Sequence, residues 1–197
     1  MQLSEKAGNM SPSITLAITA KANELKSQGV DVVSFGAGEP DFNTPDNIIQ
    51  AAIKAMHDGK TKYTPAGGIL ELKQTICEKF KKDNNLDYKP SQITISTGGK
   101  QCLANAFMSI LNPGDEVLIP VPYWVSYPEL VKLADGTPVF VETSKENNYK
   151  YTVTDLKKVT SDKTKAIIIN SPNNPTGTIY TAEELAEIAD FAKENDL

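Results

Sequence analysis

Histidine and cysteine are scarce in this sequence, and their scarcity argues against several kinds of site. His57 is the only histidine, which argues against catalytic triads that use histidine and against zinc sites with several histidines. Cys77 and Cys102 lie far apart and share no metal-type spacing. We therefore expect reduced, partly buried thiols, as is typical of a cytoplasmic protein.

Long apolar runs and basic clusters are also missing. No apolar segment approaches the roughly 20 residues that cross a membrane, and the first residues lack the apolar core of a signal peptide. The net charge is −5, without a cluster of lysine and arginine. These absences argue against a membrane protein and against a nucleic-acid surface.

The remaining composition is that of an ordinary globular protein, with 197 residues of which 40% are hydrophobic. Segments with helical spacing of apolar residues alternate with short apolar runs. The runs predict strands at 32–35, 93–97, 117–119, 138–142 and 166–169. The periodic segments predict helices at 12–27, 45–56, 69–80, 103–111, 155–159 and 182–194. A further helix is predicted to follow the loop 120–127 and to end at residue 133.

This alternation predicts an α/β fold, with a largely parallel sheet, helices on both faces and an N-terminal helical arm before it. Thr181 and Glu184 form a capping box that starts the last predicted helix. In a repeating α/β pattern such a helix leads into another strand, but the sequence stops at Leu197. We therefore expect the chain to be part of a longer polypeptide.

The most informative segment runs from Ala166 to Gly177. A short apolar strand leads into Asn170-Ser171-Pro172-Asn173-Asn174-Pro175-Thr176-Gly177, where prolines on both sides restrict the backbone. Proteins of the α/β class bind ligands at the carboxyl ends of strands. We expect this rigid loop to present the side-chain amide of Asn174 to a ligand.

A second candidate is Ser96-Thr97-Gly98-Gly99-Lys100-Gln101, which joins a predicted strand to a helix. Its glycines allow a sharp turn and the helix N-terminus adds partial positive charge, so the turn can bind an anion such as phosphate. A P-loop is excluded, because Thr94 replaces its first glycine and Gln101 its serine or threonine. A plain Gly-Gly connection with an exposed lysine is the alternative interpretation.

Three further residues have both a functional and a structural interpretation. Trp124, the only tryptophan, either stacks a planar ring on its flat face or packs in the core. Gly38, in Gly36-Ala37-Gly38, either presents a backbone N–H group to a carboxylate or belongs to a tight turn. Tyr63 is either an exposed hydroxyl donor or the anchor of its loop.

Taken together, the order of these motifs resembles that of fold-type I pyridoxal-phosphate enzymes, and most closely the class I aspartate aminotransferase family in its bacterial Ib branch. The resemblance spans nearly the whole chain but only about the first half of such an enzyme. The matching stretches are 35–42, 62–63, 98–101, 122–128 and 170–177.

The resemblance implies a cytoplasmic homodimeric enzyme that moves an amino group between an amino acid, first of all aspartate or glutamate, and a 2-oxo acid. Residues 1–44 would form the N-terminal arm and a small-domain segment, and residues 45–197 the first part of the large domain. The implied cofactor is pyridoxal 5'-phosphate. Its phosphate would be held by Gly99, Lys100, Gln101 and, in the partner subunit's site, Tyr63.

Further roles follow from the same resemblance. Trp124 would stack on the pyridine ring of the cofactor, and Asn174 would bond the phenolic oxygen of that ring. Gly38 would contact the α-carboxylate of the substrate, and both Thr15 and Lys100 would lie near the distal carboxylate of an acidic substrate. The substrate-binding residues are thus Gly38, Trp124, Asn174 and Thr15, and no metal is implied.

The resemblance also implies what the chain lacks. The Schiff-base lysine, the acid at the pyridinium nitrogen and the arginine for the α-carboxylate all belong beyond Leu197, so we expect no catalytic residue here and no activity of the chain alone. The family pattern further implies cis peptide bonds before Pro122 and Pro175.

Other interpretations stay open at this point. Within the same enzyme class, the alternatives are an aromatic, alanine or prephenate aminotransferase, or a C–S lyase. From other classes, the alternatives are a non-catalytic effector-binding domain of a transcription regulator and a structural fragment that binds nothing.

Overall fold

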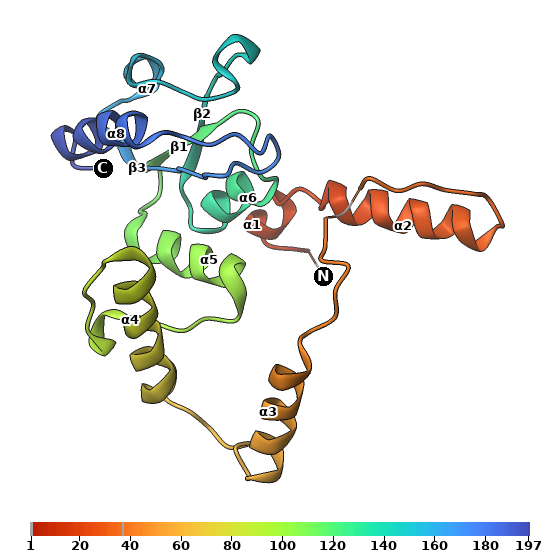
Figure 1. The fold of residues 1–197 in the computed structure, drawn as a ribbon. Helices are drawn as coiled ribbons and strands as arrows, with labels where there is room; N and C mark the ends of the chain where they lie inside the picture. Colours follow the sequence, from red (N-terminus) through yellow and green to blue (C-terminus); the bar gives the residue numbers. More distant parts are fainter. Residues whose placement is uncertain (1, 37) are drawn as a thin grey trace. The chain divides into compact units, whose positions relative to one another are not determined.

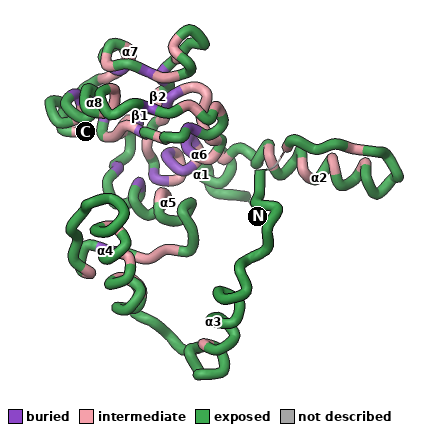
Figure 2. Tube along the Cα trace, in the orientation of Figure 1, coloured by how far each residue is buried: buried purple, intermediate pink, exposed green. Residues whose placement is uncertain are grey.

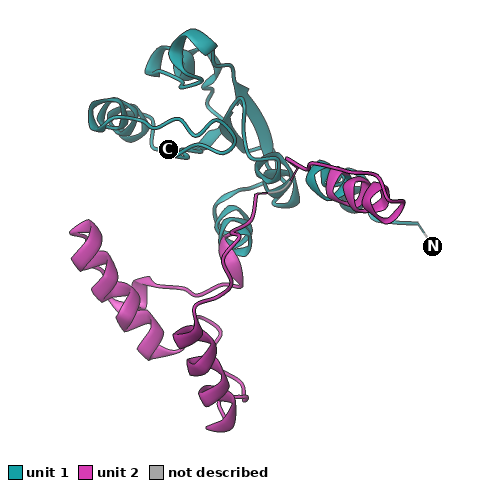
Figure 3. Ribbon diagram, turned by 45° about the vertical axis from the view of Figure 1, so that its right-hand side comes forward, with its two compact units in different colours: residues 1–17, 100–197 teal, residues 18–99 magenta. Residues whose placement is uncertain are grey.

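The computed structural model describes residues 2–36 and 38–197. The chain forms two compact units, one made by residues 1–17 and 100–197 and the other by residues 18–99 (Figure 3). In the described residues, no helix combines the length and the apolar character that crossing a membrane requires. The predicted domain boundary after residue 44 stays a prediction.

A three-stranded parallel sheet lies at the centre of the described part of the unit that contains residues 100–197 (Figure 1). Its strands follow the order β2-β1-β3, and β1 pairs with β2 from Glu116↔Thr137 to Pro120↔Val141. The three predicted strands in this part of the sequence are confirmed, with small shifts of their ends. The strands are β1 (Glu116–Pro120), β2 (Thr137–Val141) and β3 (Thr164–Ile167). The helices and 3-10 turn of this unit are α1 (Glu5–Gly8), most of α5 (Gly98–Ile110), α6 (Ser126–Leu133), η2 (Lys145–Asn147), α7 (Val153–Val159) and α8 (Ala182–Glu194).

Helices cover both faces of this sheet, as predicted. Successive side chains of a strand point to opposite faces, and β1 uses this alternation. Val117 and Ile119 pack with side chains from α5 and α6, whereas Leu118 packs with side chains from α7 and α8. All three side chains are fully buried, and Figure 2 shows buried residues gathered on the sheet and on α6.

The last helix begins where the sequence predicts. The Thr181 hydroxyl accepts a hydrogen bond from the Glu184 N–H group, and the Glu184 carboxylate accepts one from the Thr181 N–H group at 2.7 Å. This reciprocal cap pairs two donors that a helix N-terminus otherwise leaves unpaired. From this start, α8 contributes Ile188 and Phe191 to the buried cluster that contains Leu118 of β1.

The described part of the unit of residues 18–99 is helical. It contains most of α2 (Ile14–Ser27), together with α3 (Asp46–His57), α4 (Leu70–Asn84) and the 3-10 turn η1 (Pro90–Gln92). None of these helices has a buried residue, and apolar side chains on their surfaces are exposed. Their amphipathic pattern therefore predicts the helices correctly, although the structure buries none of their apolar faces.

Two predicted strands do not form. Residues 32–35 and 93–97 pair with no strand in the part of the chain that the structure describes. In the second segment the Ile95 N–H group bonds the carbonyl of Gly67 at 3.1 Å, and Gly67 lies in a turn and not in a strand. Apolar composition predicts that a segment can be a strand, but only a neighbour that pairs with its N–H and C=O groups makes it one.

Two finer predictions are also wrong. Pro45 is the N-cap of α3 and not its first residue, because the helix begins at Asp46. Cys77 is half-buried as expected, but Cys102 is exposed on α5. The apolar face of α5 explains the second result, since it turns Leu103 and Phe107 rather than Cys102 toward the core.

Candidate functional site

Two loops leave neighbouring strands at the same edge of the sheet. One follows β1 and carries Trp124, and the other follows β3 and carries Asn174. Because β1 and β3 are parallel neighbours, their carboxyl ends lie together. This is the edge where proteins of the α/β class bind ligands. The loops that carry the two predicted contact residues, Trp124 and Asn174, therefore both begin at this edge.

Both predicted cis peptide bonds are present in these loops. The bonds Val121–Pro122 and Asn174–Pro175 are cis, and Ser171–Pro172 is cis as well. The prediction is therefore confirmed in the loop after β1 and in the loop after β3, with one cis bond more than expected.

Asn173 ties the two loops together, a role that the sequence did not predict. Its buried side-chain amide donates to the Thr176 hydroxyl at 2.9 Å and to the Pro122 carbonyl at 3.4 Å. Its backbone N–H group donates to the Thr178 carbonyl, and its carbonyl accepts from the Gly177 N–H group. A buried amide with partners on both loops holds them in one arrangement. No spacing rule distinguishes this asparagine from its neighbour Asn174.

Asn174 itself is held by its backbone. Its N–H group donates to the Asn170 side-chain oxygen at 2.8 Å, and the residue is exposed. The loop thus fixes the main chain of Asn174 and leaves the residue exposed, and its contact with a ligand stays a prediction.

Tyr151 and Tyr180 hold the two ends of the loop after β3. The Tyr151 hydroxyl donates to the Ile168 carbonyl at 3.3 Å, and the Tyr180 hydroxyl accepts from the Tyr151 N–H group at 3.0 Å. The Tyr180 N–H group donates in turn to the Ser171 hydroxyl at 3.1 Å. Burial raises the pKa of both phenols, and the proximity of Tyr180 raises that of Tyr151 further. These shifts favour the neutral, protonated form of both hydroxyls, the form that can donate a hydrogen bond.

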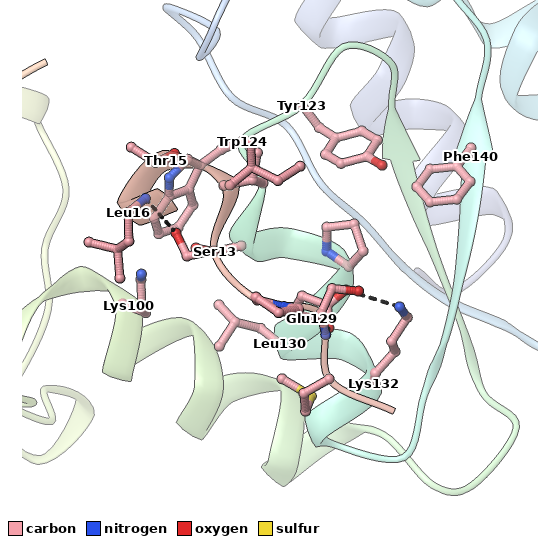
Figure 4. A pocket seen from close by; sticks show the side chains of 17 residues that line it. Ser13, Thr15, Leu16, Lys100, Tyr123, Trp124, Glu129, Leu130, Lys132 and Phe140 are labelled. Carbon is pink, nitrogen blue, oxygen red and sulfur yellow. Dashed lines mark hydrogen bonds and ion pairs between the residues drawn. The ribbon is translucent and has the colours of Figure 1, made fainter. Parts of the chain in front are cut away.

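A cavity of about 660 Å³ lies beside the loop that carries Trp124 (Figure 4). Its walls come from residues 10–16, from this loop, and from α5, α6 and β2. Thr15, Lys100 and Trp124, to which the family resemblance gives roles in binding, line it together. Asn174 is not among the lining residues. Its loop is joined to the loop of Trp124 by the hydrogen bond from the Asn173 amide to the Pro122 carbonyl.

One positive charge dominates this cavity. The Lys100 ammonium lies 5.1 Å from the centre of the Trp124 ring, a cation–π contact. Glu129 and Lys132 also line the cavity, and they neutralise each other with a carboxylate oxygen 2.9 Å from the ammonium. Among the described residues that line the cavity, Lys100 is the charge that no carboxylate neutralises, so the cavity suits an anion.

The first turn of α5 adds a second place for an anion. Gly98 opens the helix with a φ of +81°, and a Cβ built on Gly98 or Gly99 would meet no atom within 4 Å. The first turn of a helix leaves backbone N–H groups without helical partners. Gly99, Lys100 and Gln101 are exposed there.

Gly38 and Tyr63 belong to the unit of residues 18–99, and both are exposed in it. Ala37 lies outside the described residues, so the predicted carboxylate-binding turn is described only at Gly36 and Gly38. The roles of Gly38 and Tyr63 stay predictions.

Comparison with known proteins decides the family. The family model described as "Aminotransferase class I and II" matches residues 30–197. The chain belongs to this family. The resemblance drawn from the order of the motifs is therefore confirmed.

Several aminotransferases are similar to this family member. The aspartate aminotransferase of Bacillus sp. (strain YM-2) is 60% identical over 99% of the chain, and the probable aspartate/prephenate aminotransferase of Aquifex aeolicus is 52% identical over 99%. The structure of aspartate aminotransferase from Thermus thermophilus with maleate matches 100% of the chain with a TM-score of 0.96 and 47% identity. The chain spans about half the length of these relatives, with 50% of each of the two sequences and 52% of the solved structure covered.

Proposed function

We propose that this chain forms the N-terminal part of a pyridoxal-phosphate-dependent aminotransferase that moves an amino group between aspartate or glutamate and a 2-oxo acid. The observation that carries the proposal is the cavity in which Thr15, Lys100 and Trp124 meet. The family match and the aspartate aminotransferases among the relatives support it.

The residues present fit pyridoxal phosphate. The open first turn of α5 at Gly99, Lys100 and Gln101 suits a phosphate group, and the flat face of Trp124 suits an aromatic ring. The exposed Asn174 suits the phenolic oxygen, and an amide that donates to this oxygen favours its ionised form. When bound, the cofactor supplies the electron sink for carbanion chemistry, which no side chain provides.

The same cavity suits an acidic substrate. A dicarboxylic amino acid carries one carboxylate more than a neutral one, and Lys100 can bind that extra carboxylate with a charge-assisted hydrogen bond. Thr15 lines the same cavity, and by family resemblance we assign it to the neighbourhood of that extra carboxylate. We assign the α-carboxylate to the Gly38 N–H group by family resemblance.

Three further elements of the proposal come from the family resemblance. They are a homodimer in which Tyr63 serves the partner subunit's site, a division into residues 1–44 and 45–197, and a cytoplasmic location. A symmetric dimer that shares its sites places the same residue in both sites. Each of these elements can fail without affecting the roles of Lys100 and Trp124.

The ligand class can be tested on the chain itself, because Trp124 is its only tryptophan and lines the cavity. Succinate, a dicarboxylate without an amino group, should change the fluorescence of Trp124, and butyrate at equal concentration should not. Lys100→Met should weaken succinate binding by about tenfold, which corresponds to about 1.4 kcal/mol. Lys193→Met, on α8, is the matched control and should leave binding unchanged. Equal succinate affinity of the Lys100→Met and Lys193→Met variants would contradict the proposal.

The activity should be measured on the complete polypeptide that the gene encodes. With pyridoxal phosphate, aspartate and 2-oxoglutarate, we expect amino transfer by the complete polypeptide and none by the chain of 197 residues. Prephenate belongs in the assay as a second acceptor, because some relatives are named aspartate/prephenate aminotransferases. Robust turnover by the 197-residue chain would refute the assignment of the catalytic lysine to another part of the polypeptide.

A further inference from the structure

The segment of residues 10–16 forms one wall of the cavity and carries Thr15. Its second half is held by α2, because the Ser13 hydroxyl accepts a hydrogen bond from the Leu16 N–H group at 3.3 Å and the Ser13 carbonyl accepts one from the Ala17 N–H group at 3.1 Å. These bonds attach the segment to α2 and not to α6, so its attachment to α6 depends on another contact.

Glu129 of α6 makes that contact. One of its carboxylate oxygens accepts a hydrogen bond from the Ser11 N–H group at 2.9 Å, and the other accepts one from the Lys132 ammonium, also at 2.9 Å. The Glu129 side chain is only 19% exposed. Burial acts to raise the pKa of Glu129, but the hydrogen bonds from Ser11 and Lys132 together outweigh it and hold the pKa below its ordinary value. The carboxylate is therefore ionised near neutral pH.

A second contact of the N-terminal region is weaker. The Lys6 ammonium lies 2.8 Å from a carboxylate oxygen of Asp135 and donates to the Leu133 carbonyl. The side chains of Lys6 and Asp135 are 44% and 50% exposed, and exposed ion pairs contribute little stability. This contact also lies several residues before the cavity wall, so it constrains Ser11 only through the intervening chain.

We propose that Glu129 is a positioning residue, which holds residues 10–16 in place as a wall of the cavity and thereby sets the position of Thr15. A charge-assisted hydrogen bond to a backbone N–H group is stronger than a neutral one, and Ser11 lies four residues before Thr15. Glu129 touches neither substrate nor cofactor in this role. The proposal rests on the proposed function only where it expects the ligand of this cavity to be a dicarboxylate.

The direct test is the hydrogen-exchange rate of the Ser11 amide, measured by NMR on the 197-residue chain. Glu129→Met keeps the length of the side chain and helix propensity but removes both acceptors. It should speed exchange at Ser11 by at least about tenfold, the usual effect of losing one such bond. Glu129→Gln keeps one neutral acceptor and should give an intermediate rate. Lys132→Met leaves the bond to Ser11 and should change the rate by less than about threefold.

Two controls separate this role from a loss of overall stability. Glu187→Met changes a glutamate of α8 outside the cavity and should leave exchange at Ser11 unchanged. The Ile168 amide, bonded to the Leu118 carbonyl in the sheet, should exchange at the same slow rate in all variants. If the Ser11 and Ile168 amides accelerate equally in Glu129→Met, or if the Ser11 rate does not change, the positioning role is refuted.

Succinate binding, followed by Trp124 fluorescence, then tests the consequence for the ligand. Because Glu129→Met also leaves the Lys132 ammonium of the cavity without its carboxylate, the comparison is made in a Lys132→Met background. In that background Glu129→Met should raise the dissociation constant of succinate by about threefold or more with Lys100 intact, and Glu187→Met should not. Equal succinate binding by Lys132→Met and by the Glu129→Met/Lys132→Met double variant would refute the link between Ser11 and the ligand. A response of Ser11 exchange to Glu129→Met, combined with no effect of Lys100→Met on succinate, would refute the proposed function and leave the positioning role in place.

Discussion

Removing one phenolic oxygen from Tyr151 or from Tyr180 should destabilise the chain by different amounts. The substitutions Tyr151→Phe and Tyr180→Phe delete the same group, and both residues are almost fully buried, with 2% and 7% of their surface exposed. The two substitutions differ in the backbone group that loses its hydrogen-bond partner. Tyr180→Phe deprives the buried Tyr151 N–H group of its acceptor, whereas Tyr151→Phe deprives the Ile168 carbonyl of a donor.

The structure gives an order for the two effects. An unpaired buried N–H group costs about 1–3 kcal/mol, and unpaired N–H groups are rarer in proteins than carbonyls that lack one partner. The bond from Tyr151 is also long, at 3.3 Å against 3.0 Å for the bond to Tyr180. We therefore expect Tyr180→Phe to lower the free energy of unfolding by about 1–3 kcal/mol and Tyr151→Phe by about 0.5–1.5 kcal/mol.

Urea denaturation followed by Trp124 fluorescence measures this difference, because Trp124 lies in the same unit as both tyrosines. Tyr149→Phe is the control, since Tyr149 is 40% exposed and its hydroxyl should contribute less than about 0.5 kcal/mol. The reasoning would be refuted by a larger loss in Tyr151→Phe than in Tyr180→Phe, or by losses in both that equal the loss in Tyr149→Phe.

Three further predictions concern the same unit. Leu118→Ala should lower the free energy of unfolding by about 2–5 kcal/mol in urea, because Leu118 is fully buried between α7 and α8, while Leu3→Ala at an exposed position should stay within about 0.5 kcal/mol. Thr181→Ala removes the hydroxyl that caps α8 and should cost about 1 kcal/mol, seen as a lower thermal midpoint; an unchanged midpoint would contradict the cap's contribution. Burial raises the pKa of Tyr151 above that of an unfolded tyrosine, about 10, so the stabilisation is complete below this pH and is lost as the pH rises toward the folded value. Unfolding free energies measured from pH 9 to 11 should fall less steeply in Tyr151→Phe than in the unchanged chain, and parallel curves would contradict this.

The sequence predicts those parts of the fold that depend on local rules. The capping box at Thr181 and Glu184 places the start of α8 at the observed residue, because the reciprocal hydrogen bonds need only side chains three positions apart. Short apolar runs separated by helical segments predict the sheet around β1, because a strand that is buried on both faces contains few polar residues. The segment 32–35 fails by the same rule, since its apolar residues satisfy the pattern but find no neighbouring strand among the described residues.

The candidate site was predictable only in part. Motifs identify Lys100 and Trp124 because their positions in the chain repeat a family order, and the structure brings both to one cavity with Thr15. Asn173 and Glu129 could not be found in this way, because their roles depend on hydrogen bonds to the backbone of distant segments. Glu129 accepts a hydrogen bond from Ser11, which lies 118 positions away in the sequence. Because the donor is a backbone N–H group, which almost every residue has, the residue types do not indicate this bond.

Residues that motifs identify would contact a ligand, whereas residues that motifs miss hold the contact residues in position. Asn174 can donate its amide to a fixed point only if its backbone is fixed, and the structure assigns that task to Asn170, Asn173 and the two buried tyrosines. The proline-bracketed motif restricts the loop internally, but it does not set where the loop lies relative to β1. The bond from Asn173 to the Pro122 carbonyl does so, because it joins the loop of Asn174 to the loop of Trp124. A chain with an intact motif but without these contacts would keep the residues of the site and lose their arrangement.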